Sequence, residues 1–146
     1  MDDLDAVLLE KLIQNARIPK TSLARMLNLT EAAVRKRLKK LEDSGVITGY
    51  RALVDYQKAG LSSSLTGVDT DPEKLWSVIS QLKTVPEVRF LFLTTGDHTI
   101  MAEIVTESVE KMEETHRRIE AFEGVRRVCP AVVLKQIELR RGPSLA

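Results

Sequence analysis

The chain has 146 residues, enough for one ordinary domain or two small ones. Its 43% hydrophobic and 29% charged residues exclude a disordered chain. A single cysteine, Cys129, excludes a disulfide framework and a cysteine metal cluster. The acidic N-terminus does not resemble a signal peptide, and no apolar run approaches the roughly 18 residues of a membrane span. We therefore expect a cytoplasmic protein with no membrane partner.

The net charge is only +1, but positive charge is concentrated in one stretch. Residues 1–50 contain nine Lys/Arg and seven Asp/Glu, whereas residues 51–146 contain thirteen and fourteen. Five basic residues fill six positions from Arg35 to Lys40, interrupted only by Leu38. A local stripe of this kind can bind phosphates on a protein that is nearly neutral overall.

Two helices are predicted before the basic stretch. Apolar residues spaced by four indicate a helix over about residues 3–16. A second, short helix is expected over residues 21–28, capped by Thr21 or Ser22. Asn28 suits the turn that follows, because asparagine tolerates left-handed backbone angles.

The basic stretch lies on a third predicted helix. Thr30 is a good N-cap for it, and Gly45 is a natural residue just beyond its end. Val34, Leu38 and Leu41 are spaced by four and three, which predicts the buried stripe. Two short helices joined by a turn of about three residues make a helix-turn-helix, whose second helix normally enters the major groove of DNA.

The side chains opposite the buried stripe suit contact with DNA. The small Ala32 and Ala33 permit close approach to base edges, and Glu31 and Arg35 can read bases. Basic residues further along suit phosphates, which give affinity but little sequence information. The alternative is a basic helix face that is merely solvated. The predicted DNA-binding residues are Thr30, Glu31, Ala32, Ala33, Arg35, Lys36, Arg37, Lys39 and Lys40.

A connecting segment follows the predicted DNA-binding domain, residues 1–50. Residues 46–55, VITGYRALVD, alternate in part and predict a strand, which could form a wing or lead to a second domain. Residues 51–61 are interpreted as a hinge strand.

Residues 62–146 show a strand-helix-strand pattern twice. This pattern predicts a ferredoxin-like βαββαβ domain, so the whole chain belongs to the α+β class. Four strands with both helices on one face leave the other face uncovered, and an open apolar face favours self-association. The expected strands cover residues 63–71, 85–95, 99–106 and 131–140, and the expected helices cover residues 72–83 and 107–122.

Pattern and spacing also predict which side chains of these helices are buried. For the first helix they are Leu75, Ile79 and Leu82, and for the second they are Val109, Met112, His116 or Ile119, and Phe122. Pro130, just before the last expected strand, is interpreted as an edge or bulge residue. Cys129 is interpreted as a small buried residue in preference to a redox sensor.

The turn at residues 94–99, TTGDHT, has two interpretations. Gly96 allows a positive φ and Asp97 can bond nearby backbone amides, as in an ordinary tight hairpin. Alternatively, its hydroxyls, backbone groups and Asp97 carboxylate capture a small zwitterion.

The stretches LDAVLLEKLIQNAR, TSLARMLNLTEAAVRKRLKKLEDSGVITGY and FLTTGDHTIMAEI, in this order and spacing, resemble the Lrp/AsnC (feast/famine) transcriptional regulators. The resemblance covers essentially the whole chain. It implies a winged helix-turn-helix, a hinge strand and a sensor domain. It also implies homodimers that often assemble further, to tetramers or octamers, on double-stranded DNA.

The resemblance further implies an effector, usually an amino acid, bound near the Gly-Asp turn between subunits. The resemblance assigns effector binding first to Gly96 and Asp97, and then to Thr95, His98 and Thr99. Leu134 and Gln136 are candidates from across the interface. The chain departs from the usual pattern at His98, which leaves the identity of the ligand open. No cofactor is expected.

Three alternatives remain at this point. Sirohaem decarboxylases share the two-domain outline, but the chain has only two histidines, His98 and His116, and no nucleophile-base pair or metal-ligand cluster is apparent. A sensor module that has lost DNA binding is a second alternative, and the basic stretch argues against it. A DNA-binding protein without an effector is the third.

Overall fold

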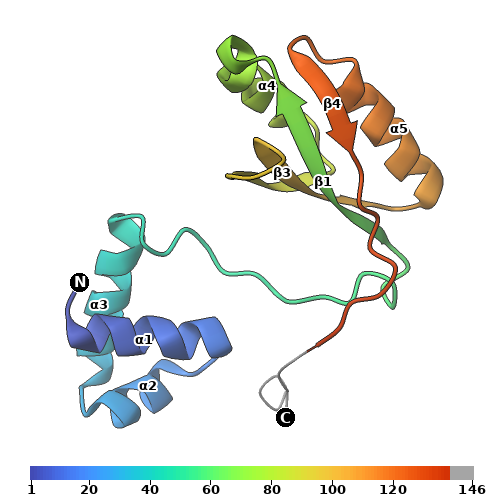
Figure 1. The fold of residues 1–146 in the computed structure, drawn as a ribbon. Coiled ribbons are helices and arrows are strands. Elements are labelled where there is room, and N and C mark those ends of the chain that lie inside the picture. The colour runs from blue at the N-terminus through green and yellow to red at the C-terminus, as the bar shows by residue number, and fades with distance from the viewer. Residues whose placement is uncertain (139–146) are drawn as a thin grey trace. The chain divides into compact units, whose positions relative to one another are not determined.

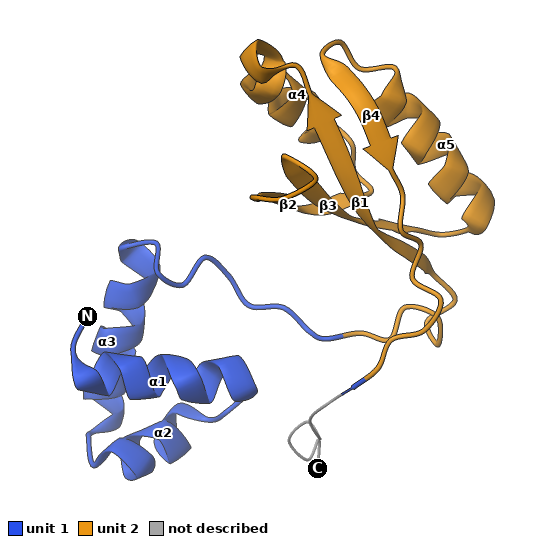
Figure 2. Ribbon diagram, in the orientation of Figure 1, with its two compact units in different colours: residues 1–53, 138–146 blue, residues 54–137 orange. Residues whose placement is uncertain are grey.

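The computed structural model describes residues 1–138, which divide into two compact units (Figure 2). Residues 1–53 and residue 138 belong to the first unit, and residues 54–137 form the second. None of the helices in this part of the chain is long and apolar enough to cross a membrane.

The first unit consists of three helices, α1 (Asp3–Gln14), α2 (Lys20–Leu27) and α3 (Glu31–Asp43) (Figure 1). One apolar stripe from each helix meets in a single core. Burial of these stripes, at about 25 cal/mol per Å², holds the three short helices together. The buried core residues are Leu8, Leu23, Ala24, Val34, Leu38 and Leu41, which confirms the predicted stripe on α3.

The predicted cap at Thr30 and the turn at Asn28 are confirmed, whereas α1 ends at Gln14, two residues before the predicted end, and the start of α2 differs. Thr30 Oγ1 accepts a hydrogen bond from the backbone N–H of Ala33 at 3.1 Å, and Asn28 adopts a left-handed φ of 54°. The predicted cap of α2 at Thr21 or Ser22 is wrong, because the helix begins at Lys20. Pro19 precedes it, and its fixed φ of −61° leads the chain into the helix without a side-chain cap.

Residues 46–61 contain no strand, so the strand predicted over residues 46–55 and the hinge strand over residues 51–61 do not form in the single chain. A strand needs a neighbour for its backbone groups, and none of the described strands pairs with this segment. Leu53 is 93% exposed. A hydrogen-bonded turn instead closes at Leu61, whose N–H donates to Tyr56 O at 2.8 Å.

The second unit is a four-stranded antiparallel sheet of order β2-β3-β1-β4, with α4 and α5 on one face (Figure 1). Residues of both helices share one buried cluster with β1 and β3, so the other face of the sheet stays open. The α+β class and the ferredoxin-like βαββαβ pattern are confirmed. In chain order the elements are β1 (Ser62–Thr70), the 3₁₀ turn η1 (Pro72–Lys74), α4 (Leu75–Leu82), β2 (Val88–Leu93), β3 (Ile100–Thr106), α5 (Val109–Glu120) and β4 (Val125–Cys129).

The last strand differs from the prediction. It was expected over residues 131–140, but β4 ends at Cys129; residues 139 and 140 lie outside the described part. Pro130 has no N–H to donate, so it interrupts the ladder at the edge of the sheet. Pairing with β1 resumes beyond it, where Ala131 and Leu65 exchange two backbone hydrogen bonds.

Burial on the helices follows the predicted pattern in part. Ile79, Leu82, Met112, His116 and Ile119 are buried, Leu75 and Phe122 are half-buried, and Val78, which was not predicted, is completely buried. Val109 is exposed, because it is the first residue of α5 and lies outside the packed cluster. Thr115 is buried on α5 instead, and its hydroxyl donates to Lys111 O at 2.7 Å. The hydrogen bond offsets the cost of burying the hydroxyl.

His116 is a buried polar side chain between α5 and β1. Its Nε2 lies 2.8 Å from Thr66 Oγ1 and 3.4 Å from Ser64 Oγ. Burial lowers the pKa of His116 below its ordinary value of 6.5, because the charged imidazolium loses hydration. Folding therefore favours the neutral form of this side chain.

The lowered pKa of His116 makes folding stability depend on pH. At pH values between the pKa of His116 in the folded chain and 6.5, the unfolded chain binds more protons than the folded chain. The contribution of neutral His116 to the free energy of unfolding is therefore fully present above pH 6.5 and decreases as the pH falls below 6.5. We expect the melting temperature to fall between pH 7.5 and 5.5, and to fall less in His116→Gln, measured by circular dichroism. Equal losses in the two proteins would contradict this assignment.

Candidate nucleic-acid interface and sensor-domain turn

The outer face of α3 carries small and basic side chains. Ala32, Lys36 and Lys39 are exposed on the side opposite the buried stripe, and Ala33 is half-buried on the flank. The small residues lie in the first turn of the helix, after the Thr30 cap. This end of α3 can approach a surface closely, as a recognition helix does at its N-terminal end.

Glu31 and Arg35 face each other one turn apart. Arg35 Nη2 donates to Glu31 Oε1 at 2.5 Å, and both side chains are substantially exposed. An exposed ion pair of this kind contributes little to stability, so both groups can exchange partners at low cost. The pair thus keeps an exposed arginine near the start of α3.

Arg37 is committed to the protein itself. Its Nη1 donates to Asp2 Oδ2 at 2.7 Å and to Asp5 Oδ1 at 2.9 Å, and its side chain is only 27% exposed. The hydrogen bond from Arg37 lowers the pKa of Asp2, and the Asp5 side chain is 3% exposed. The predicted phosphate contact of Arg37 does not fit this geometry, because the side chain joins α3 to α1.

The three lysines of α3 differ in availability. Lys39 Nζ donates to Asp43 Oδ2 at 2.8 Å, a partner that was not predicted. Lys36 and Lys40 are exposed and form no ion pair with the residues that the structure describes. These two are the cations of α3 best placed for phosphates.

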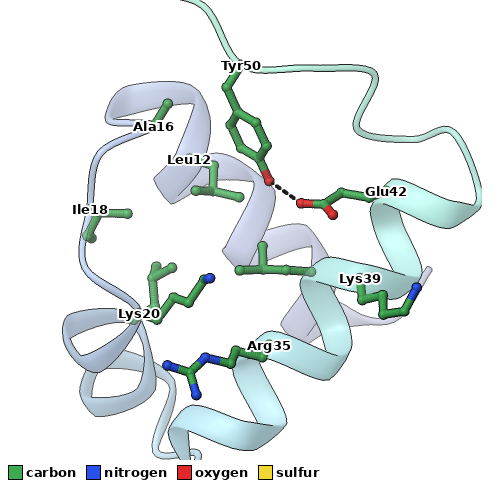
Figure 3. Close-up of a pocket in the computed structure, with 10 residues that line it drawn as sticks. Leu12, Ala16, Ile18, Lys20, Arg35, Lys39, Glu42 and Tyr50 are labelled. Atoms are coloured by element: carbon green, nitrogen blue, oxygen red, sulfur yellow. Dashed lines mark hydrogen bonds between the residues drawn. The ribbon is translucent and has the colours of Figure 1, made fainter.

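A hollow of about 500 Å³ adjoins α3 within the first unit (Figure 3). Lys20, Arg35 and Lys39 line it over an apolar base. Tyr50 also lines it and donates its hydroxyl to Glu42 at 2.8 Å. Burial and the Glu42 carboxylate raise the pKa of Tyr50 to about 12. Lys20 and Tyr50 were not predicted to lie here, because nothing in their spacing places them beside α3.

The turn between β2 and β3 is a closed loop with an exposed tip. Thr94 N–H donates to Thr99 O at 3.0 Å, and Thr94 Oγ1 donates to His98 O at 2.8 Å. Gly96 has the predicted positive φ, at 100°. The exposed predicted residues are Thr95, Gly96, Asp97 and Thr99.

His98 alone of the predicted turn residues is half-buried. Its Nδ1 donates to Asp69 Oδ1 at 3.1 Å, and Arg127 Nε donates to Asp69 Oδ2 at 3.0 Å. Asp69 and Arg127 were not predicted as neighbours of the turn, since only the register of β1 and β4 brings them opposite each other.

Leu134 and Gln136 are exposed and lie outside any strand. The Leu134 carbonyl accepts a hydrogen bond from Gln57 Nε2. No described hydrogen bond or ion pair joins either residue to the turn at 94–99. Their contribution across a subunit interface stays a prediction.

Comparison with known proteins assigns both halves of the chain. Residues 63–143 match the family model of the Lrp/AsnC ligand binding domain, and residues 1–42 match that of the AsnC-type helix-turn-helix domain. The chain is therefore a member of the Lrp/AsnC family, DNA-binding transcriptional regulators with a ligand-binding domain, and it is not an enzyme.

Individual relatives and structures agree with this assignment. The HTH-type transcriptional regulator LrpA of Pyrococcus horikoshii is 42% identical over 140 residues, which are 94% of this chain and 99% of that relative. LysM of Sulfurisphaera tokodaii is 34% identical over 92% of this chain and 96% of its own length. The structure of LrpC from B. subtilis has the same fold, with a TM-score of 0.73, 24% identity, and coverage of 96% of this chain and 99% of that one.

The different roles assigned to Lys36 and Arg37 can be separated experimentally. Lys36→Gln should reduce the slope of log affinity for duplex DNA against log salt by about 1 for each subunit that contacts DNA, since each loses one phosphate contact. Arg37→Gln should leave that slope unchanged but lower the melting temperature, because it leaves the buried Asp5 without its partner. Fluorescence anisotropy over a salt series and thermal melts measure both quantities. An unchanged melting temperature with a reduced slope in Arg37→Gln would contradict the assignment.

Proposed function

We propose that the chain is a sequence-specific regulator whose assembly or DNA affinity responds to a small effector, an amino acid, bound at the turn 95–99 beside a subunit interface. The observation that carries this proposal is an exposed polar turn at the end of a sheet whose open face is apolar.

The open face of the sheet suits a second copy of the chain. Leu65, Phe90 and Phe92 are 52%, 41% and 51% exposed, and the two phenylalanine rings stack with centroids 5.4 Å apart. A large exposed apolar patch normally binds a partner, and symmetric self-association covers it in both subunits at once. A homodimer is thus the basic unit, and tetramers or octamers follow from further contacts.

A dimer presents two copies of α3 to DNA. Two recognition helices related by a twofold axis read the half-sites of a pseudo-palindrome. Ala32, Ala33 and the Glu31–Arg35 pair lie at the end of the helix that would meet base edges, and Lys36 and Lys40 would meet phosphates.

The turn offers groups of both kinds that a zwitterion needs. The Asp97 carboxylate can accept hydrogen bonds from an α-amino group, and the hydroxyls of Thr95 and Thr99 can donate to an α-carboxylate. Leu134 and Gln136 of a neighbouring copy would complete the site. An effector bound there changes DNA binding only by favouring one assembly over another.

A thermal-shift screen of the twenty amino acids tests the effector proposal. A binder should raise the melting temperature by mass action, and the increase should be lost in Asp97→Asn. Glu123→Gln, an exposed carboxylate in the same unit, is the matched control and should keep the increase. Light scattering and DNA affinity should then change with the same compound.

A screen without any binder, together with unchanged mass and DNA affinity, would contradict the effector proposal. Salt-dependent DNA binding would persist in that case, which identifies a DNA-binding protein that works without an effector.

A further inference from the structure

Three potential metal ligands converge on the open side of the sheet. Ligand atoms of Asp69, His98 and Cys129 all lie within 4.8 Å of one another, and each residue is half-buried. The three residues come from β1, from the turn after β2 and from the end of β4. They are far apart in the sequence, so only the folded sheet brings them together.

The pairing of β1 with β4 creates the space for this cluster. Cys129 is opposite Gly67, and Asp69 follows Gly67 by two residues on the same strand. A Cβ atom at Gly67 would lie 2.4 Å from Cγ of His98. The glycine therefore lets the imidazole lie directly over the backbone of β1.

The spacing of the ligand atoms suits a tetrahedral ion. Zinc binds nitrogen, oxygen and sulfur at about 2.0–2.3 Å, which places its ligand atoms about 3.3–3.6 Å apart. His98 Nδ1 and Asp69 Oδ1 are already 3.1 Å apart. Small side-chain rotations at Cys129 would close the remaining distance.

Arg127 orients the carboxylate for such a role. Its Nε donates to Asp69 Oδ2 at 3.0 Å and leaves Oδ1 directed toward His98. Carboxylate ligands of metals are commonly held by an outer hydrogen bond of this kind. An ion pair between Asp69 and His98 alone would explain two of the residues, but it gives no role to the nearby thiol.

We propose that Asp69, His98 and Cys129 form a binding site for a divalent zinc-like cation, with the fourth coordination position open. Mixed sulfur, nitrogen and oxygen ligands favour zinc over the hard cations magnesium and calcium. The thiolate and carboxylate together balance the charge of the ion. A bound ion would fix the turn at 94–99 to β1 and β4. The site requires neither the proposed effector nor DNA.

Cobalt provides a direct measurement on the full chain, reduced and freed of metal with a chelator. Cys129 is the only cysteine, so a thiolate-to-cobalt charge-transfer absorption reports on this residue alone. We expect the absorption to saturate at one Co²⁺ per chain and to disappear when Zn²⁺ is added. His98→Gln and Asp69→Asn should weaken Co²⁺ binding by at least about tenfold. Asp71→Asn, two residues from Asp69, is the matched control and should bind as the unchanged chain does.

A second measurement needs no variant. Zn²⁺ should slow alkylation of the Cys129 thiol in the unchanged chain, whereas Mg²⁺ should not. Absence of a saturable cobalt absorption, together with alkylation unaffected by Zn²⁺, would overturn the proposal. Binding by His98→Gln with unchanged affinity would overturn it as well.

Discussion

The orientation of α3 depends on one packing constraint, the burial of Val34, Leu38 and Leu41 against the other two helices. Successive residues of an α-helix are rotated by about 100° about its axis. Once these three side chains point inward, the directions of all the other side chains of α3 are therefore determined. Ala32 and Lys36 then point away from the protein. Arg37 adds a directional restraint through its hydrogen bonds to α1. The basic stretch thus has two parts, one that reinforces the domain and one available to a polyanion.

In the second unit, the two faces of the sheet also differ in role. One face is covered by α4 and α5 and includes a satisfied polar contact between Thr66 and His116. The other face is apolar near Phe90 and Phe92, and polar around Asp69 and His98. A partner subunit and a small ligand would therefore occupy different parts of the same open surface. In the proposed function, this proximity lets ligand binding influence assembly.

Sequence patterns were sufficient where the structure is governed by local periodicity. The stripe on α3, the Thr30 cap and the left-handed Asn28 all follow from spacing and residue type. The missing strand between the units and the early end of β4 depend on which neighbour is available, and spacing carries no such information. The hydrogen bonds of Arg37 and the Asp69–His98–Cys129 cluster likewise depend on contacts between residues that are far apart in the sequence. Charge along a sequence shows where cations are, and the folded structure shows which of them already have partners.

The role of the outer face of α3 can be tested most directly by acetylating lysines with and without duplex DNA and measuring each site by mass spectrometry. This experiment works for any assembly size. DNA should protect Lys36 and Lys40 strongly, while Lys58 and Lys83, which lie outside the helical unit, should react equally in both samples. Unchanged reactivity of Lys36 and Lys40 in a sample that demonstrably binds DNA would contradict the assignment of α3 as the DNA-contacting helix.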